Sequence, residues 1–384
     1  MRHQRGGNLP TVGVVGAGVI GSCVSLFLAQ CGVRVHCVDR GRPGGLTTDA
    51  SFARLSAYQQ PTYRRFELSH AGIIEHAHFA GLFDSAPWWH PTGSLAWAGA
   101  DGRCGVSTRS FVEEAERLRS WGYRVIWHDA AKVSRELEPA IPFSPAQTPV
   151  AHLTEEGWID GPLMVSSVLD AAKSIGEVTL SNAGVQEIEL RGRQVTALRL
   201  DDGERLEVDA VVNAAGPQAP AVAATLGSPM VSGIADRSSL VLDLAGDSDP
   251  LRHVLRGAEL HARSAGPGRV RVRSEQVDAV LTGEAESDLG RDNVENLLDR
   301  AYRTIPALKA FTIERKRIGT AVFPADGLPS AGALSTVSGY YEAFANSGVI
   351  LAPLIGRALA TQITTGEIPS LLRDCSPDRL RVAA

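Results

Sequence analysis

Three glycines near the start of the chain, Gly16, Gly18 and Gly21, have the spacing of a phosphate-binding turn. They follow a β-branched run, Val12 to Val15, which is typical of a strand buried on both faces. The first glycine permits a tight turn, the second lets a pyrophosphate approach the backbone, and the third lets a helix pack closely on the strand. The spacing therefore predicts a dinucleotide site, although the same pattern serves NAD, NADP and FAD.

The elements around these glycines complete a nucleotide-binding unit. A helix is predicted from about Val19 to Gln30, and the amides of its first turn would face the phosphates. A second strand, Val33 to Val38, ends at Asp39. A carboxylate there accepts hydrogen bonds from ribose hydroxyls and repels a 2′-phosphate, which disfavours NADP, although the neighbouring Arg40 weakens that argument.

The composition excludes several classes of protein. The chain has 384 residues, enough for two packed domains, and a net charge of -5, so it lacks the basic patch of a nucleic-acid-binding protein. No apolar run suggests a membrane span, and the basic, polar N-terminus does not resemble a signal peptide, so we expect a cytoplasmic protein without a membrane partner. The cysteines lack metal spacing and are expected to be small buried side chains in a reducing compartment, with no metal site; they are Cys23, Cys31, Cys37, Cys104 and Cys375.

Three later stretches have the character of ligand-contacting segments. A loop after the second strand contains Thr47, Thr48 and Ser51, which could bind phosphate or a cofactor ring, or equally form a polar linker or helix cap. An apolar strand at 210–213, expected beside the first strand, runs into Ala214, Ala215 and Gly216, where small side chains let a bulky ligand lie close to the backbone.

The third stretch is a second junction of strand, glycine and helix, far along the chain. A strand is predicted at 340–345, a loop at Asn346 to Gly348, and an apolar helix to about Thr365.

In their order and spacing along the chain, four stretches of sequence resemble the FAD-dependent glycine/D-amino acid oxidase family, which includes sarcosine oxidase-like enzymes. They are the opening glycine unit with Asp39, "EEGWIDGPLMVSSVLDAA", "DAVVNAAGPQAP", and "FPADGLPSAGAL" with "ANSGVILAPLIGRALA". They span nearly the whole chain, and an NAD-dependent dehydrogenase has no reason to carry the last two. The alternatives are an NAD-dependent opine-type dehydrogenase and a flavoprotein subunit without its own amine oxidation activity.

The resemblance implies an α/β chain, α+β overall, with a discontinuous Rossmann-like FAD-binding domain and a mainly antiparallel β-sheet substrate domain. The FAD-binding domain would comprise 10–83, 148–226 and 319–372, and the substrate domain 84–147 and 227–318, with tails at 1–9 and 373–384. The residues implied to contact FAD are Gly16, Gly18, Val19, Ile20, Gly21, Asp39, Arg40, Thr47, Thr48, Ser51, Val185, Ala214, Ala215, Gly216, Asn346, Ser347, Gly348, Val349 and Ile350.

Two departures from the family pattern concern the substrate and the flavin link. In this family an arginine commonly binds the substrate carboxylate. When the sequence is aligned on Asp326 and Gly327, the position of that arginine falls near Ala321. No cysteine stands in the C-terminal stretch where sarcosine-oxidase relatives tether flavin, so we predict non-covalent FAD. The arginines that could replace the missing one are Arg54, Arg263, Arg273 and Arg317.

The reaction implied is oxidation of a C–N bond of an amine or amino-acid-derived substrate to an imine, by hydride transfer to flavin N5. The electron acceptor is O2 or another molecule, and an enzyme of specialised metabolism acting on a larger or cyclic amine fits the departure at Ala321. No catalytic base is identified, and four tryptophans, Trp88, Trp89, Trp97 and Trp158, are expected to be core or interface aromatics. The candidates for lining the substrate are Arg54, Tyr58, His90, His261 and Arg317.

Overall fold

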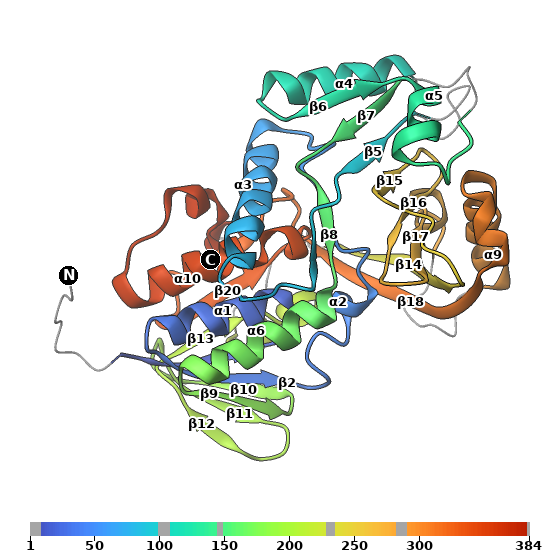
Figure 1. The fold of residues 1–384 in the computed structure, drawn as a ribbon. Helices are drawn as coiled ribbons and strands as arrows, with labels where there is room; N and C mark the ends of the chain where they lie inside the picture. The colour runs from blue at the N-terminus through green and yellow to red at the C-terminus, as the bar shows by residue number, and fades with distance from the viewer. Residues whose placement is uncertain (1–8, 99–107, 144–148, 228–234, 282–289, 382–384) are drawn as a thin grey trace. The chain divides into compact units, whose positions relative to one another are not determined.

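The computed structural model describes residues 9–98, 108–143, 149–227, 235–281 and 290–381 (Figure 1). The chain forms two compact units. The first comprises Met1–Asp49, Gly161–Asp236 and Ala321–Ala384, and the second Ala50–Asp160 and Arg237–Thr320. These units divide the chain differently from the expected domains, because residues 50–83 and 148–160 group with the second unit. Cys104, expected to be buried, and parts of the two expected tails lie outside the described residues.

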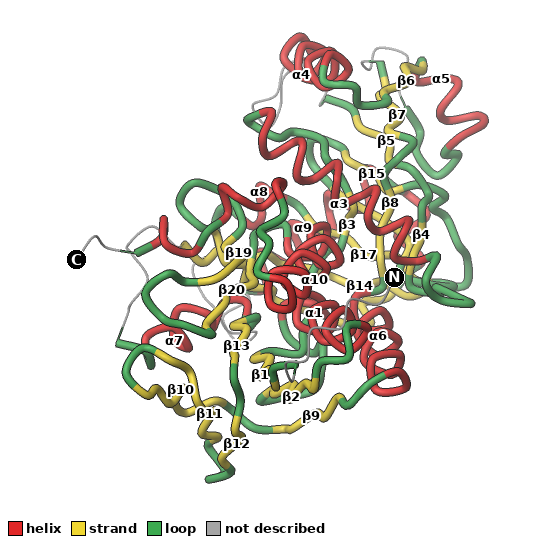
Figure 2. The backbone as a smooth tube through the Cα atoms, turned by 90° about the vertical axis from the view of Figure 1, so that its left-hand side faces the viewer, coloured by secondary structure: helices red, strands yellow, loops and turns green. Residues whose placement is uncertain are grey.

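The first unit is built on a six-stranded sheet with the order β19-β20-β13-β1-β2-β9. β1 (Thr11–Val15) lies between β13 (Ala210–Asn213) and β2 (Arg34–Asp39) and pairs parallel with both, as the sequence predicts (Figure 2). β9 (Val178–Asn182) and β20 (Tyr340–Phe344) extend the parallel sheet on either side. β19 (Ser330–Ala333) closes one edge, antiparallel to β20.

Three helices pack together in this unit, and the central one is almost wholly buried. They are α1 (Val19–Gln30), α6 (Gly161–Ile175) and α10 (Gly348–Thr365). α1 and α10 approach closely at Gly356, where an added Cβ would lie 2.8 Å from the carbonyl carbon of Cys23. Among the described residues α10 alone is long and apolar enough to cross a membrane, but 56% of that stretch is buried inside the protein, as in a core helix.

The rest of the first unit consists of a small sheet and short helices. β10 (Val185–Arg191), β11 (Gln194–Leu200) and β12 (Arg205–Glu207) form an antiparallel meander, with Gly192 and Gly203 at positive φ in the connecting turns. A short helix, α7 (Ala219–Ala224), follows β13.

The C-terminal segment was expected to be a tail from residue 373, and this prediction is wrong for the described part. Two 3-10 turns, η6 (Ser370–Cys375) and η7 (Pro377–Leu380), pack against β19. Arg381 then forms a buried ion pair with Glu342, a residue of the central sheet. A short apolar segment with charged neighbours gives no sequence signal for such docking, because its partners lie far away in the chain.

The second unit contains an eight-stranded sheet with the order β18-β14-β17-β16-β15-β5-β7-β6. β14, β17, β16 and β15 pair antiparallel, and β15 pairs parallel with β5, so the sheet is mainly antiparallel, as expected. The strands are β18 (Thr312–Phe323), β14 (Ala235–Ala245), β17 (Arg269–Arg273), β16 (His261–Ser264), β15 (Val254–Arg256), β5 (Ser94–Ala96), β7 (Val150–Leu153) and β6 (Val125–His128).

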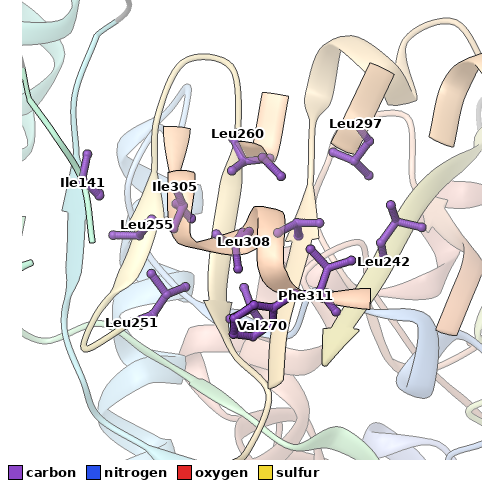
Figure 3. Close-up of a cluster of buried hydrophobic side chains, with 14 of the residues drawn as sticks. Ile141, Leu242, Leu251, Leu255, Leu260, Val270, Leu297, Ile305, Leu308 and Phe311 are labelled. Carbon is purple, nitrogen blue, oxygen red and sulfur yellow. The ribbon is translucent and has the colours of Figure 1, made fainter. Parts of the chain in front are cut away.

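A helix and a 3-10 turn cover one face of this sheet and enclose its core (Figure 3). α9 (Arg291–Thr304) contributes Leu297, and η5 (Pro306–Ala310) contributes Leu308, both fully buried against sheet residues such as Leu242 and Val270. A three-stranded sheet of β3 (Arg54–Leu55), β8 (Gly157–Ile159) and β4 (Trp89–His90) completes the strands of the unit. The longer remaining helices are α3 (Tyr63–Ala80) and α4 (Thr108–Ser120).

Candidate cofactor and substrate sites

The turn between β1 and α1 can be formed only by glycine at two positions. Gly16 has φ +100°, and an added Cβ would lie 2.5 Å from the carbonyl oxygen of Ala214. At Gly21 an added Cβ would lie 1.8 Å from the carbonyl oxygen of Gly16. Helix α1 begins at Val19, with Gly18 as an N-cap that offers no side-chain oxygen and no acidic residue in its first turn. A diphosphate fits this turn, because bare backbone meets the positive end of a helix there.

Asp39, the last residue of β2, is held in place through both carboxylate oxygens. Oδ2 accepts a hydrogen bond from the Ala17 amide at 2.7 Å, and Oδ1 accepts one from the Gly41 amide at 2.9 Å. Beside it, a cavity of about 360 Å³ is lined by residues 40–43 and 180–182, at the carboxyl ends of β2 and β9. Nucleotides bind at this edge of parallel sheets, so the cavity and Asp39 suit the adenosine part of a dinucleotide.

The loop after β2 folds back onto the glycine turn. Thr48, in α2 (Thr47–Ala50), accepts a hydrogen bond through Oγ1 from the Val19 amide at 3.3 Å and so caps α1. Ser51 belongs to the second unit, where its Oγ accepts a hydrogen bond from the Ala53 amide at 2.9 Å. Of the polar residues predicted in this loop, the structure therefore brings Thr48 to the glycine turn.

The end of β13 is anchored by a buried asparagine. The Asn213 Nδ2 donates to the Tyr340 hydroxyl and to the Ala219 carbonyl, each at 2.8 Å. Its Oδ1 accepts a weak hydrogen bond from the Ala215 amide at 3.3 Å. These bonds fix the small-residue segment 214–216 beside β1, where the Ala214 amide donates to the Val15 carbonyl at 2.8 Å.

The start of α10 approaches the start of α1. An added Cβ on Gly348 would lie 3.3 Å from Ile20 Cδ1, and Ile350 is buried. The helix starts after Ser347 with no side-chain cap and no acidic residue in its first turn, so its positive end is not offset. Val185 begins β10 opposite Leu200, and its backbone contact with adenine stays a prediction.

Three of the five predicted substrate-lining residues come together in the second unit: Arg54 on β3, Tyr58, and His261 on β16. Arg256 on β15 joins them, because it pairs with His261 across the sheet and its guanidinium lies 4.8 Å from the centre of the Tyr58 ring. Tyr58, Arg256 and His261 are all buried. We name Arg54, Tyr58, Arg256 and His261 the arginine cluster. Sequence reasoning missed Arg256, since a single arginine in a short strand gives no signal.

Burial and the repulsion between neighbouring positive charges shift the pKa values of the residues in the arginine cluster. Burial, followed by the charge of Arg256, lowers the pKa of Arg54 to about 9, so Arg54 is still cationic at neutral pH. Burial and the charges of Arg54 and Arg256 hold the pKa of His261 well below its usual range, so its imidazole is neutral. Burial raises the pKa of Tyr58, which keeps its hydroxyl protonated.

The other predicted arginines have partners inside the second unit. Arg317 and Arg271 both bind Asp243 in a buried group, with Arg271 Nε 2.7 Å from Oδ1. Burial opposes ionisation of Asp243, but its bonds to Arg271 and Arg317 outweigh burial and lower its pKa to about 2. Because Arg317 already has this counter-ion, the structure disfavours it as a substrate ligand. Arg273 is likewise paired, with Asp278, at 2.6 Å.

Two buried arginines of this unit hold a loop. Arg263 Nε donates to the Phe52 carbonyl at 2.5 Å, and its guanidinium lies 4.3 Å from the Trp158 ring centre. Arg271 Nη1 donates to the Ser51 carbonyl at 2.7 Å. The loop that leads to Arg54 is thus fixed by side chains from β16 and β17.

His90 lies on β4, whereas the arginine cluster comes from β3, β15, β16 and Tyr58. Its ring stacks on Trp158 with the ring centres 3.7 Å apart, beside a cavity of about 280 Å³ that Thr92, Arg252 and His253 also line. Burial, followed by the charge of Arg263, lowers the pKa of His90. Trp88, Trp97 and Trp158 are buried, as expected of core aromatics, and Trp89 is partly buried.

Ala321, near which the family's carboxylate arginine is expected from the sequence, lies in β18 and is partly buried. Within the part of the chain that the structure describes, no group of three His, Cys, Asp or Glu residues could hold a metal ion.

Comparison with known proteins decides the family. The sequence model of the DAO family, described as FAD dependent oxidoreductase, matches residues 11–362. The chain belongs to this family. The DAO-family assignment and the FAD cofactor predicted from sequence are therefore confirmed. An uncharacterized oxidoreductase of Bacillus subtilis (strain 168), YurR, is 22% identical over 369 residues, which cover 90% of this chain and 93% of that protein.

Solved structures of the DAO family share the fold at low identity. A glycine oxidase from Geobacillus kaustophilus superposes with a TM-score of 0.83 at 19% identity, covering 96% of this chain and 98% of that one. An iminodiacetate oxidase from Chelativorans sp. BNC1 gives a TM-score of 0.79 at 19% identity, covering 95% and 98%. These similarities confirm the mixed α/β fold.

Proposed function

We propose that this DAO-family protein oxidises the C–N bond of a small amine or amino-acid-derived substrate to an imine. The observation that carries the proposal is the arginine cluster of the second unit, in which Tyr58, Arg256 and His261 are buried and Arg54 is partly buried, in a chain whose first unit fits FAD. The structural neighbours that act on glycine and on iminodiacetate support this class of reaction.

FAD, when bound, supplies the two-electron acceptor for the C–H bond next to the substrate nitrogen. The glycine turn and the N-terminus of α1 would hold its pyrophosphate, and Asp39 its ribose. The uncompensated N-terminus of α10 would stabilise negative charge, which is what a helix N-terminus offers a ring that becomes anionic on reduction. Within this proposal the first unit binds the cofactor and the second binds the substrate.

The arginine cluster favours the neutral form of an amine. An amine gives up a hydride only when its nitrogen lone pair is free, so the substrate ammonium must lose a proton. The positive charge and the burial that lower the pKa of His261 act on a bound ammonium in the same direction. A dedicated catalytic base is then unnecessary, and the neutral His261 imidazole orients the amine through a hydrogen bond.

Three finer points belong to the same proposal. FAD is held non-covalently, since Cys375 is buried in η6 and no cysteine lies in β20 or α10. The electrons pass on to O2 or to another acceptor. The protein acts in the cytoplasm, without a nucleic-acid or membrane partner.

An anaerobic flavin-reduction screen tests the proposal. The purified holoenzyme is mixed with D-amino acids, N-methyl amino acids, glycine and cyclic imino acids, and loss of flavin absorbance is recorded by stopped flow. We expect at least one of these classes to bleach the flavin. If none does, the chain is a flavoprotein that does not oxidise such amines, and the proposal fails.

A further inference from the structure

A carboxylate lies fully buried in the central sheet of the first unit. It belongs to Glu342 on β20, whose register partner on β13 is Asn213, also fully buried. Tyr340, two residues earlier on β20, lies on the same face of the sheet, because side chains alternate along a strand. A buried charge is strongly destabilising unless it is paired, so Glu342 requires a counter-charge.

Arg381 supplies this counter-charge from the end of the described chain. It follows η7, and its guanidinium forms an ion pair with Glu342 Oε1, although its own side chain is only 9% exposed. Its Nε and Nη1 have no hydrogen-bond partner among the described residues. Replacing a buried ion pair by apolar side chains is often neutral or stabilising. The pair therefore indicates that an ionised carboxylate is needed on this face, rather than added stability.

The charge of Arg381 is what chiefly keeps Glu342 ionised. Burial raises the pKa of Glu342, and the charge of Arg381 is the largest of the effects that oppose burial. The other hydrogen bonds to this carboxylate come from neutral hydroxyls, and the shorter one is donated by Ser330 Oγ to Oε2 at 2.6 Å. Without Arg381, the Glu342 carboxyl would be expected to take up a proton.

The ionised Glu342 sets the direction of the hydrogen bonds around Tyr340. Burial, followed by the charge of Glu342, raises the pKa of Tyr340, so its hydroxyl is protonated. This hydroxyl donates a long bond to Glu342 Oε1, at 3.4 Å, and accepts one from Asn213 Nδ2 at 2.8 Å. A hydroxyl has a single proton, so an acceptor at Glu342 leaves a lone pair of the Tyr340 oxygen for Asn213.

The amide of Asn213 passes this orientation to the backbone that follows β13. Its Nδ2 has two acceptors, the Tyr340 hydroxyl and the Ala219 carbonyl, each at 2.8 Å. Turning the amide round would place its oxygen against the Ala219 carbonyl, so the orientation is fixed. Asn213 Oδ1 then faces the Ala215 amide, from which it accepts a bond at 3.3 Å.

Segment 214–216 forms one wall of the glycine turn. An added Cβ on Gly16 would lie 2.5 Å from the Ala214 carbonyl oxygen, and the Ala214 amide donates to the Val15 carbonyl at 2.8 Å. A displacement of this segment therefore changes the space in front of the turn, where the pyrophosphate of FAD would bind.

We infer that Arg381 is a positioning residue for the FAD that the first unit binds. Arg381, Glu342, Tyr340 and Asn213, which we name the C-terminal relay, hold segment 214–216 against the glycine turn. The C-terminal segment then contributes to the affinity for FAD and not only to the stability of the fold. The inference rests on the proposed function for the placement of FAD beside this segment, but the affinity for FAD is measured without turnover.

The first experiment measures the release of FAD from the purified holoenzyme. Recovery of flavin fluorescence on dilution gives the dissociation constant, and the melting temperature of each variant is recorded with it. Arg381→Met removes the charge at similar length and should weaken FAD binding on the order of 10-fold, because Glu342 loses its counter-charge. Arg381→Lys keeps the charge and should restore most of the affinity.

A second pair of variants interrupts the relay at one atom. Tyr340→Phe removes the hydroxyl that accepts from Asn213 while Arg381 stays paired, and it should weaken FAD binding severalfold. Ser330→Ala is the matched control, since it removes another buried hydroxyl that is bonded to Glu342 but lies off the path to Asn213. It should bind FAD like the wild type.

Leu372→Ala separates positioning from simple docking of the C-terminal segment. Leu372 is buried in η6 and lies outside the relay. Its truncation should lower the melting temperature, as a cavity in a core does, and leave the FAD dissociation constant unchanged. If Leu372→Ala weakens FAD binding as much as Arg381→Met does, the segment acts through docking alone and the inference is overturned.

The inference is also overturned if either Arg381→Met or Tyr340→Phe keeps wild-type affinity for FAD, whatever amines the enzyme oxidises. If Arg381→Met does not fold, the comparison of Tyr340→Phe with Ser330→Ala decides. If no amine reduces the flavin but the relay variants release FAD as expected, the proposed function fails and the positioning role of Arg381 stands.

Discussion

The two units build their candidate sites from different material. In the first unit the glycine turn and two helix starts present backbone amides, and Asp39 is itself held by backbone amides of Ala17 and Gly41. In the second unit the arginine cluster consists of side chains collected from separate strands. A backbone site is fixed by local chain geometry, whereas a side-chain site depends on packing around it. Substitutions in the first unit should therefore act mainly on flavin binding, and substitutions in the second unit mainly on the packing and charge balance of buried side chains.

The largest effect is expected from Gly21→Ala. Its new Cβ would lie 1.8 Å from the Gly16 carbonyl oxygen, so the turn must open or α1 must move away from β1. We expect purified protein without flavin, measured as the ratio of flavin to protein absorbance. Gly290→Ala is the control, because an added Cβ there meets no atom within 4 Å. Normal flavin content in Gly21→Ala would contradict the structure of the turn.

This contrast also explains what could be predicted from sequence. The glycine spacing, the strand ends at Asp39 and Asn213, and the start of α10 were predictable because each depends on a few consecutive residues. Arg256 and Asp243 were not, because their roles come from strands more than 150 residues from Arg54 and Ser51 in the chain. Docking of Arg381 on Glu342 was missed for the same reason.

The next largest effect is expected at Asp243. Asp243→Asn leaves the buried guanidiniums of Arg271 and Arg317 without their counter-charge, which costs about 3–5 kcal/mol. This loss in the free energy of unfolding is measured by urea denaturation, with tryptophan fluorescence as the signal. Glu314→Gln is the matched control, since its ion pair with Arg269 is exposed and contributes about 0–1 kcal/mol. If Asp243→Asn and Glu314→Gln lose the same free energy of unfolding, burial does not make the Asp243 ion pairs more stabilising than an exposed pair.

The same group predicts a pH dependence. The pKa of Asp243 is lowered to about 2 in the folded protein and is about 3.9 when unfolded, so the folded state binds the proton less tightly. Its stabilising contribution is complete above about pH 4 and is lost as the pH falls toward 2. The difference in unfolding free energy between the wild type and Asp243→Asn should therefore shrink across this interval. A difference that stays constant from pH 5 to pH 2 would rule out the ion-pair explanation.

The smallest effect is expected at Thr48, where a side chain supports the backbone site. Thr48→Val keeps the shape but removes the oxygen that accepts from the Val19 amide, a helix cap worth about 1 kcal/mol. FAD affinity, measured by fluorescence quenching on titration of apoprotein, should fall severalfold. Thr48→Ser retains the oxygen and should bind FAD nearly as well as the wild type. If both variants lose affinity alike, the methyl group and not the hydroxyl is responsible.

The positive ends of α1 and α10 have a consequence for the stability of the folded chain. Neither helix carries an acidic residue in its first turn, so a bound diphosphate or flavin would provide the negative partner that each lacks. A ligand that binds only the folded chain stabilises it by RT ln(1 + [L]/Kd), about 2.7 kcal/mol at a free concentration 100 times Kd. We therefore expect the melting temperature of the apoprotein to rise as free FAD is added.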